Sequence, residues 1–108
     1  MTTPADEIRA AADQLEPLAD KAQADLENDD YWKCYDPNTA WWDGLTNGMG
    51  GASGDLAGAI SPAAVKELAR WLRAEARRAS CASSVEGQAV VSAHALAFAR
   101  AINGGEQP

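Results

Sequence analysis

The chain has 108 residues, with 16 acidic and 9 basic side chains and a net charge of −7 at pH 7. This acidity argues against direct nucleic-acid binding, because phosphate contacts dominate that affinity, and it favours a basic protein partner. The sequence contains no run of about 18 apolar residues, the length needed to span a membrane, and its opening residues lack the basic and apolar regions of a secretory signal. We therefore expect a cytoplasmic protein.

At this length we expect a single domain over residues 1–108. The charge is unevenly distributed along it. Residues 1–60 carry twelve acidic and three basic side chains, a net of −9, whereas residues 61–108 carry four and six, a net of +2. The amino-acid composition also changes along the chain, from a long amphipathic segment through a Gly- and Trp-rich middle to two Ala-rich stretches. We therefore predict an all-α fold, a small three-helix bundle with a long Gly/Trp-rich loop between helices 1 and 2.

The first helix is predicted over about 4–27. Thr3 can cap it, and Pro4 suits its first turn. Pro17 lies inside the pattern and predicts a kink or a break, because proline removes a backbone hydrogen bond. Apolar residues recur at spacings of three and four and form one stripe: Ile8, Ala11, Ala12, Leu15, Leu18, Ala19, Ala22 and Leu26.

Residues 28–60 are predicted to form an ordered loop. Six of the nine glycines of the chain fall between Gly44 and Gly58, which disfavours a helix. The aromatic residues of this segment make it too apolar for a linker, and we expect them to pack against helices 2 and 3.

The second helix is predicted over about 62–80, with Ser61 as its cap and Pro62 at its first position. The third is predicted over about 84–103, where Ser83 and Glu86 have capping-box spacing. Residues 104–108 are expected to be a frayed tail.

Four carboxylates of the first helix recur every seven residues and lie about 150° from its apolar stripe, so they face outward. We call this set the acidic ridge; it consists of Asp6, Asp13, Asp20 and Glu27. A basic stripe on the second helix flanks the core, formed by Lys66, Arg70, Arg73 and Arg77. Two interpretations stay open: a solvated face with lateral ion pairs, or a ridge that docks on a basic surface.

Candidate catalytic and metal-binding groups are few. The glycines between Gly48 and Gly54 lack the Lys and Ser/Thr of a phosphate loop. Cys34, Cys81 and His94 have no metal-ligand spacing, and His94 is expected to be packed between helix neighbours. We therefore predict no enzyme, no cofactor and no metal site, with a small cysteine/histidine enzyme or metal-binding domain as an alternative.

The four tryptophans are the strongest indication of function, because Trp is enriched at binding hot spots. Trp41 and Trp42 are adjacent and cannot both easily point inward, so one is expected to be partly exposed. Trp71 is expected to contribute to the same kind of surface. The predicted partner-binding residues are therefore Trp41, Trp42, Trp71 and the acidic ridge.

Both chain ends resemble small proteins of actinobacteria and their phages. The opening Thr2-Thr3-Pro4-Ala5-Asp6-Glu7-Ile8-Arg9-Ala10-Ala11-Ala12 and the closing His94-Ala95-Leu96-Ala97-Phe98-Ala99-Arg100-Ala101-Ile102 carry this resemblance. It implies the cytoplasm of a bacterial host and no known activity. Separately, Trp42-Asp43-Gly44 is similar to the Trp-x-Gly turn of the WXG100 family, which implies a secreted, dimerising helical protein. The chain departs from that pattern, because it lacks the family's C-terminal Tyr-x-x-x-Asp/Glu signal.

These observations favour a non-enzymatic, acidic helical accessory protein of phage or prophage type that binds a host or phage protein, with inhibition as one outcome. The binding surface is expected on residues 31–60. A WXG100-like secreted protein is the alternative.

Overall fold

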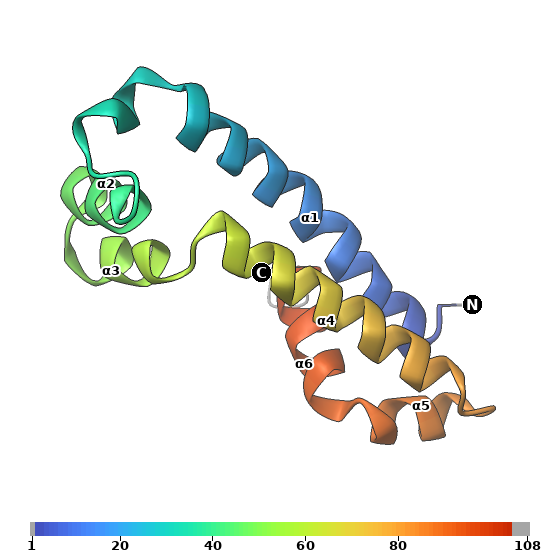
Figure 1. Cartoon of the computed structure of the whole chain (residues 1–108). Coiled ribbons are helices and arrows are strands. Elements are labelled where there is room, and N and C mark those ends of the chain that lie inside the picture. Colours follow the sequence, from blue (N-terminus) through green and yellow to red (C-terminus); the bar gives the residue numbers. More distant parts are fainter. Residues whose placement is uncertain (1, 105–108) are drawn as a thin grey trace. The chain divides into compact units, whose positions relative to one another are not determined.

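The computed structural model describes residues 2–104 of the chain, and most of these are helical, with no strand among them (Figure 1). The helices follow one another as α1 (Pro4–Asn28), the 3₁₀-helix η1 (Asp30–Cys34), α2 (Ala40–Met49), α3 (Gly51–Ala59), α4 (Pro62–Ser80), α5 (Val85–Val91) and α6 (Ala93–Ile102). Apart from Gly104, the tail expected over 104–108 lies outside the described residues.

The predicted three-helix bundle with a long loop is wrong, because six α-helices are present in the described part of the chain. Most of the expected loop over 28–60 is helical, in η1, α2 and α3. The expected third helix is two helices, α5 and α6, which meet at Ser92. Of the kink or break predicted at Pro17, the break does not occur, since α1 continues through this residue.

The glycines of α3 explain why the middle of the chain is helical. A Cβ atom on Gly54 would lie 3.1 Å from the carbonyl oxygen of Leu45, and one on Gly58 would lie 3.1 Å from the Trp42 ring. Glycine therefore lets α2 and α3 pack closely, and this contact outweighs the low helix propensity of the segment. Gly50, at φ 73°, makes the turn between the two helices.

Buried polar contacts to Ser92 and Gln88 hold the C-terminal helices in place. The Ser92 hydroxyl, which is buried, donates a hydrogen bond to the Glu75 carboxylate of α4 at 3.1 Å. The side chain of Gln88 accepts a hydrogen bond from the Ala5 N–H at 3.1 Å, which satisfies a free donor at the start of α1. The cap of α5 is Ser84, whose hydroxyl accepts from the Gly87 N–H at 2.9 Å, one residue later than the capping box predicts.

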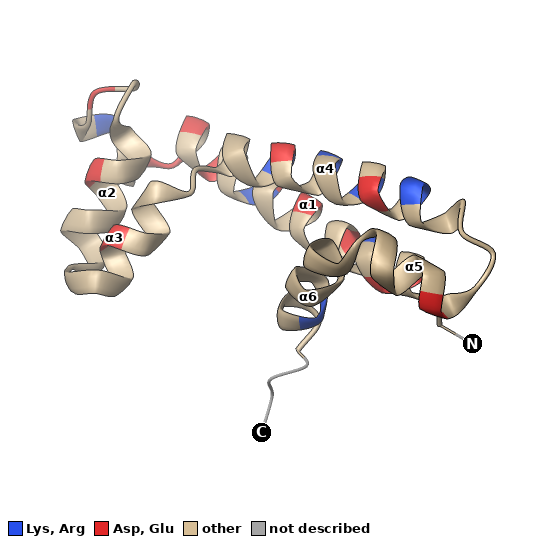
Figure 2. Ribbon diagram, turned by 90° about the horizontal axis from the view of Figure 1, so that it is seen from below, with Lys and Arg blue, Asp and Glu red and all other residues tan. Residues whose placement is uncertain are grey.

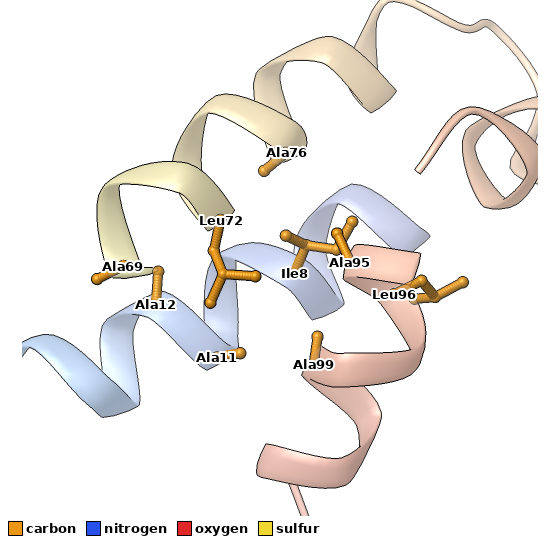
Figure 3. Close-up of a cluster of buried hydrophobic side chains, with 9 residues drawn as sticks. All are labelled: Ile8, Ala11, Ala12, Ala69, Leu72, Ala76, Ala95, Leu96 and Ala99. Atoms are coloured by element: carbon orange, nitrogen blue, oxygen red, sulfur yellow. The ribbon is translucent and has the colours of Figure 1, made fainter. Parts of the chain in front are cut away.

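The chain divides into two compact units, which we describe separately. The middle unit is Leu18–Lys66, and the terminal unit comprises the described residues of Met1–Pro17 and Glu67–Pro108. Small side chains dominate the core of the terminal unit, so its helices approach closely (Figure 3). This core consists of Ile8, Ala11, Ala12, Ala69, Leu72, Ala76, Ala95, Leu96 and Ala99.

Candidate functional site

The two adjacent tryptophans of α2 have different environments. Trp41 stacks on Trp32 with ring centroids 5.3 Å apart and planes 14° from parallel. Its indole N–H lies 3.1 Å from both the Ala57 and Ile60 carbonyl oxygens, so it joins α2 to the end of α3. One edge of the Trp42 ring lies near Gly58, and Trp42 is 45% exposed. Trp42 therefore offers surface to a partner, while Trp41 is mainly structural.

Trp71 belongs to the terminal unit and is 44% exposed. It lines a cavity of about 320 Å³ together with Val90, Val91 and His94. His94 is exposed rather than packed as the sequence predicts. Val90 is 78% exposed, so this part of the terminal unit also presents apolar surface.

The acidic ridge faces solvent, but intramolecular contacts engage its carboxylates. Within the terminal unit, Asp13 lies 2.8 Å from Arg73. Within the middle unit, Asp20 lies 3.0 Å from Lys66. These two pairs join the ridge to the basic stripe of α4, so the lateral ion pairs considered from the sequence are present. Figure 2 shows the acidic and basic residues of α1 and α4.

The two end members of the ridge differ from each other. Asp6 closes a reciprocal cap with Thr3: the Thr3 hydroxyl accepts from the Asp6 N–H, and the Asp6 carboxylate accepts from the Thr3 N–H, both at 3.1 Å. Hydrogen bonding of the Asp6 carboxylate to the Thr3 backbone, and next to the Thr3 side chain, lowers the pKa of Asp6, with Arg9 adding a smaller effect. Glu27, in the last turn of α1, accepts a hydrogen bond from the neutral amide of Gln23, at 2.8 Å, and from no other group among residues 2–104.

A cleft in the middle unit runs between the end of α1 and the segment from η1 to the start of α2. Its cavity is about 440 Å³, within the range of small ligand sites. Aromatic, apolar and charged groups line it: Gln23, Leu26, Glu27, Trp32, Lys33, Tyr35, Pro37 and Ala40. We call this cavity the α1–η1 cleft.

A second cavity of the middle unit, of about 360 Å³, adjoins this cleft. The two cavities share Gln23, Leu26 and Pro37. Trp32 lines the first, whereas Trp41 and Trp42 line the second. The stacked pair of Trp32 and Trp41 therefore contributes to both, and a ligand in the cleft would lie near the exposed Trp42.

Aromatic contacts and hydrogen bonds hold the cleft in shape. Tyr31 meets Trp32 edge-on with centroids 5.0 Å apart, and its hydroxyl donates to the Gly44 carbonyl at 2.6 Å. The nearby Tyr35 hydroxyl raises the pKa of Tyr31, and loss of solvent contact adds to this effect. The amide of Asn47 donates to the Tyr35 hydroxyl at 3.0 Å. The cleft walls are thus positioned before any ligand arrives.

The electrostatics of the middle unit favour cations. Its sequence contains eight carboxylates and three lysines. Of these eight carboxylates, all within the described residues, only two take part in ion pairs: Asp20 with Lys66, and Asp30 with Lys33. The last turn of α1 contains no basic residue. Because a helix C-terminus carries partial negative charge, the carboxylate of Glu27 adds to a negative potential there.

The two cysteines and the histidine are exposed, and both thiols are free. Cys34 belongs to the middle unit, while Cys81 and His94 belong to the terminal unit. No group of three or more His, Cys, Asp or Glu residues able to hold a metal occurs among residues 2–104. None of the described helices is both long and apolar enough to cross a membrane.

The chain matches no known family model, and no curated protein or solved structure matches it either. Trp42-Asp43-Gly44, which resembles a family turn, lies inside α2. The turn between α2 and α3 occurs at Gly50 instead.

Sequence reasoning named Glu27 for its place on the ridge but left its neighbours in the cleft, Trp32, Tyr35 and Pro37, out of the predicted binding residues. A signal was present, since the two aromatic residues among them, Trp32 and Tyr35, follow the acidic end of α1 within eight residues of Glu27. The helix end and the turn after it bring them together, which helical periodicity alone does not show.

Proposed function

We propose that this chain is a non-enzymatic accessory protein of phage or prophage type that binds a basic host or phage protein in the bacterial cytoplasm and inhibits it by doing so. The resemblance of the chain ends supports the phage-type setting. The middle unit carries the contact surface, and the exposed face of Trp42 beside two adjoining cavities is the observation on which this proposal depends.

The physical argument combines apolar area and charge. Trp is expensive to leave in water and is enriched at the centres of protein interfaces, where one residue can supply much of the binding free energy. The surplus of carboxylates in the middle unit would accelerate encounter with a basic partner and restrict which partners bind. A largely pre-formed cleft lowers the entropic cost of binding.

The two exposed tryptophans provide a matched pair of variants. Trp42 in the middle unit is 45% exposed and Trp71 in the terminal unit is 44% exposed, so their truncation removes similar accessible surface. We would immobilise wild type, Trp42→Ala and Trp71→Ala, and recover bound proteins from lysate of the native host. Circular dichroism on each variant establishes that it is folded.

The proposal places the contact on the middle unit alone, so it leaves out Trp71, which the sequence predicts as part of the surface. It therefore predicts that Trp42→Ala recovers the partner at least about tenfold less well, and that Trp71→Ala recovers it at the wild-type level. Recovery by the wild type should also fall as salt rises from about 0.05 to 0.5 M, because exposed charges are screened. Equal recovery by a folded Trp42→Ala variant would place the surface elsewhere. Recovery that does not change with salt would remove the basic partner from the proposal.

A further inference from the structure

We infer that the α1–η1 cleft receives an arginine side chain of the partner protein, with Glu27 as its counter-ion and Trp32 and Tyr35 as its aromatic walls. This inference rests on the proposed function and specifies the chemistry of the partner. It follows from a carboxylate, two aromatic rings and a helix C-terminus that meet in one cavity.

The walls of the cleft fit a flat cation with an apolar stem. Trp32 and Tyr35 are each partly buried, so part of each side chain remains accessible in the cavity. A guanidinium group stacks on aromatic faces, and it is less strongly hydrated than an ammonium group. The methylene stem of the side chain would lie against Leu26 and Pro37.

Glu27 is the carboxylate of the cleft that remains available to an incoming cation. The only other charged group in the lining, the Lys33 ammonium, lies 2.6 Å from the Asp30 carboxylate, which offsets part of its positive charge. In the described part of the chain, the only hydrogen-bonding partner of Glu27 is the neutral amide of Gln23. A carboxylate without a cationic partner can accept two parallel (bidentate) hydrogen bonds from one arginine side chain.

The end of α1 adds to the preference for a cation. A basic residue in the last turn would ordinarily offset the partial negative charge of a helix C-terminus, and α1 has none there. Asp25 and Glu27 instead place two carboxylates in this turn. The positive charge of the incoming arginine side chain therefore complements a local excess of negative charge that no basic residue in this turn offsets.

The adjoining cavity accounts for the rest of the bound segment. Because the two cavities share Gln23, Leu26 and Pro37, a side chain in the cleft would direct its backbone along that common wall. Neighbouring apolar residues of the partner would then reach Trp42 in the second cavity. The arginine and an apolar neighbour would together form one recognition unit.

The test uses the full chain and two small probes, N-acetyl-arginine-N-methylamide and its citrulline counterpart, which has nearly the same shape and no charge. Binding is followed by NMR through the indole N–H signal of Trp32. The variant is Glu27→Gln. Its matched control is Asp55→Asn, which removes one carboxylate from the same unit outside both cavities.

The arginine probe should shift the Trp32 signal in a saturable manner, and the citrulline probe should bind at least about tenfold more weakly. Glu27→Gln should weaken arginine binding about tenfold, while Asp55→Asn should change it by less than about twofold. The inference is overturned if both probes bind equally, if neither binds, or if Glu27→Gln and Asp55→Asn behave alike.

The outcomes also separate this inference from the proposed function. If the arginine probe fails while Trp42-dependent recovery of a partner persists, the partner is recognised without an arginine and only the inference falls. If the probe binds as expected while no partner is recovered through Trp42, the cleft retains its chemistry and the proposed function falls.

Discussion

The ring of Trp32 lies directly over Gly44 of α2, so that a Cβ atom on Gly44 would come within 2.8 Å of the ring carbon Cε3. No side chain fits between them without moving the ring. Because Trp32 also stacks on Trp41 and lines the α1–η1 cleft, this single contact couples the packing of the middle unit to the shape of the candidate site.

Gly44→Ala should therefore destabilise the chain although alanine favours a helix. The gain in helix propensity is up to about 1 kcal/mol, while forcing extra volume into a packed site typically costs about 1–3 kcal/mol. We expect a net loss of about 1 kcal/mol in the free energy of unfolding, measured by urea denaturation. The near-ultraviolet circular dichroism of the tryptophans should change with it.

Gly50→Ala serves as the contrast. A Cβ atom on Gly50 would meet no atom within 4 Å, but the backbone there, at φ 73° and ψ 169°, is in a region that essentially only glycine adopts, so alanine meets backbone strain and no ring. Its cost of about 1–3 kcal/mol should appear with the tryptophan spectrum unchanged. A spectral change at Gly50 equal to that at Gly44 would mean that the Trp32 contact is not the cause.

The helix starts could be predicted from the sequence because their signals are local. Pro4 and Pro62 begin α1 and α4 within one residue of a Thr or Ser that can cap. The helices α2 and α3 could not be predicted in this way. Their glycines look like turn residues in isolation, and only the close contact of Gly54 and Gly58 with α2 gives them a role in a helix.

Two further features depended on contacts remote in sequence. Ser92 divides α5 from α6, and its hydroxyl bonds to Glu75, seventeen residues earlier. Nothing in the local sequence marks Ser92 as a helix end, because serine, unlike Gly or Pro, does not ordinarily end a helix.

Of the candidate site, Trp42 and Glu27 could be named from residue type and helical phase. The cleft that contains Glu27 required knowing where the chain turns after Asn28.

Truncating Trp41 should unfold the middle unit far more readily than truncating Trp42. Trp41→Ala removes the stack on Trp32 and the indole donor shared by two carbonyl groups, and we expect a loss of about 2–4 kcal/mol. Trp42→Ala removes a half-exposed ring, and we expect less than about 1.5 kcal/mol. Urea denaturation of both variants measures the difference. Comparable losses would show that Trp42 is also mainly structural.

The ion pairs of Arg73 should contribute more than those of Arg70. Arg73 bonds to Asp13 and to Glu16, at 2.8 and 2.7 Å, and these bonds raise its pKa, with Glu16 the larger cause. Within residues 2–104, Arg70 pairs only with Glu67, one turn away on the same helix. At low salt we expect Arg73→Gln to lower the free energy of unfolding by about 1 kcal/mol and Arg70→Gln to lower it by about 0.3 kcal/mol, as measured by urea denaturation. The difference between the two losses should become smaller in 1 M NaCl. If salt does not reduce the difference between the two losses, the larger effect of Arg73→Gln comes from packing and not from charge.

The Thr3–Asp6 cap should make part of the stability acid-sensitive. Hydrogen bonds from Thr3 hold the pKa of Asp6 below its ordinary value of 3.8 in the folded chain. The folded state therefore favours the ionised carboxylate. Its stabilising contribution is fully present above the unfolded value and is lost as pH falls through the lower, folded value.

Asp6→Asn removes this dependence. The free energy of unfolding of the wild type should exceed that of Asp6→Asn by a constant amount between about pH 5 and 7, and the difference should shrink as pH falls below about 4. Asp55→Asn is the control, because Asp55 takes part in no ion pair within residues 2–104. Urea denaturation at stepped pH measures both variants. A difference between wild type and Asp6→Asn that stays constant down to pH 2 would mean that the Thr3 bonds do not depend on the charge of Asp6.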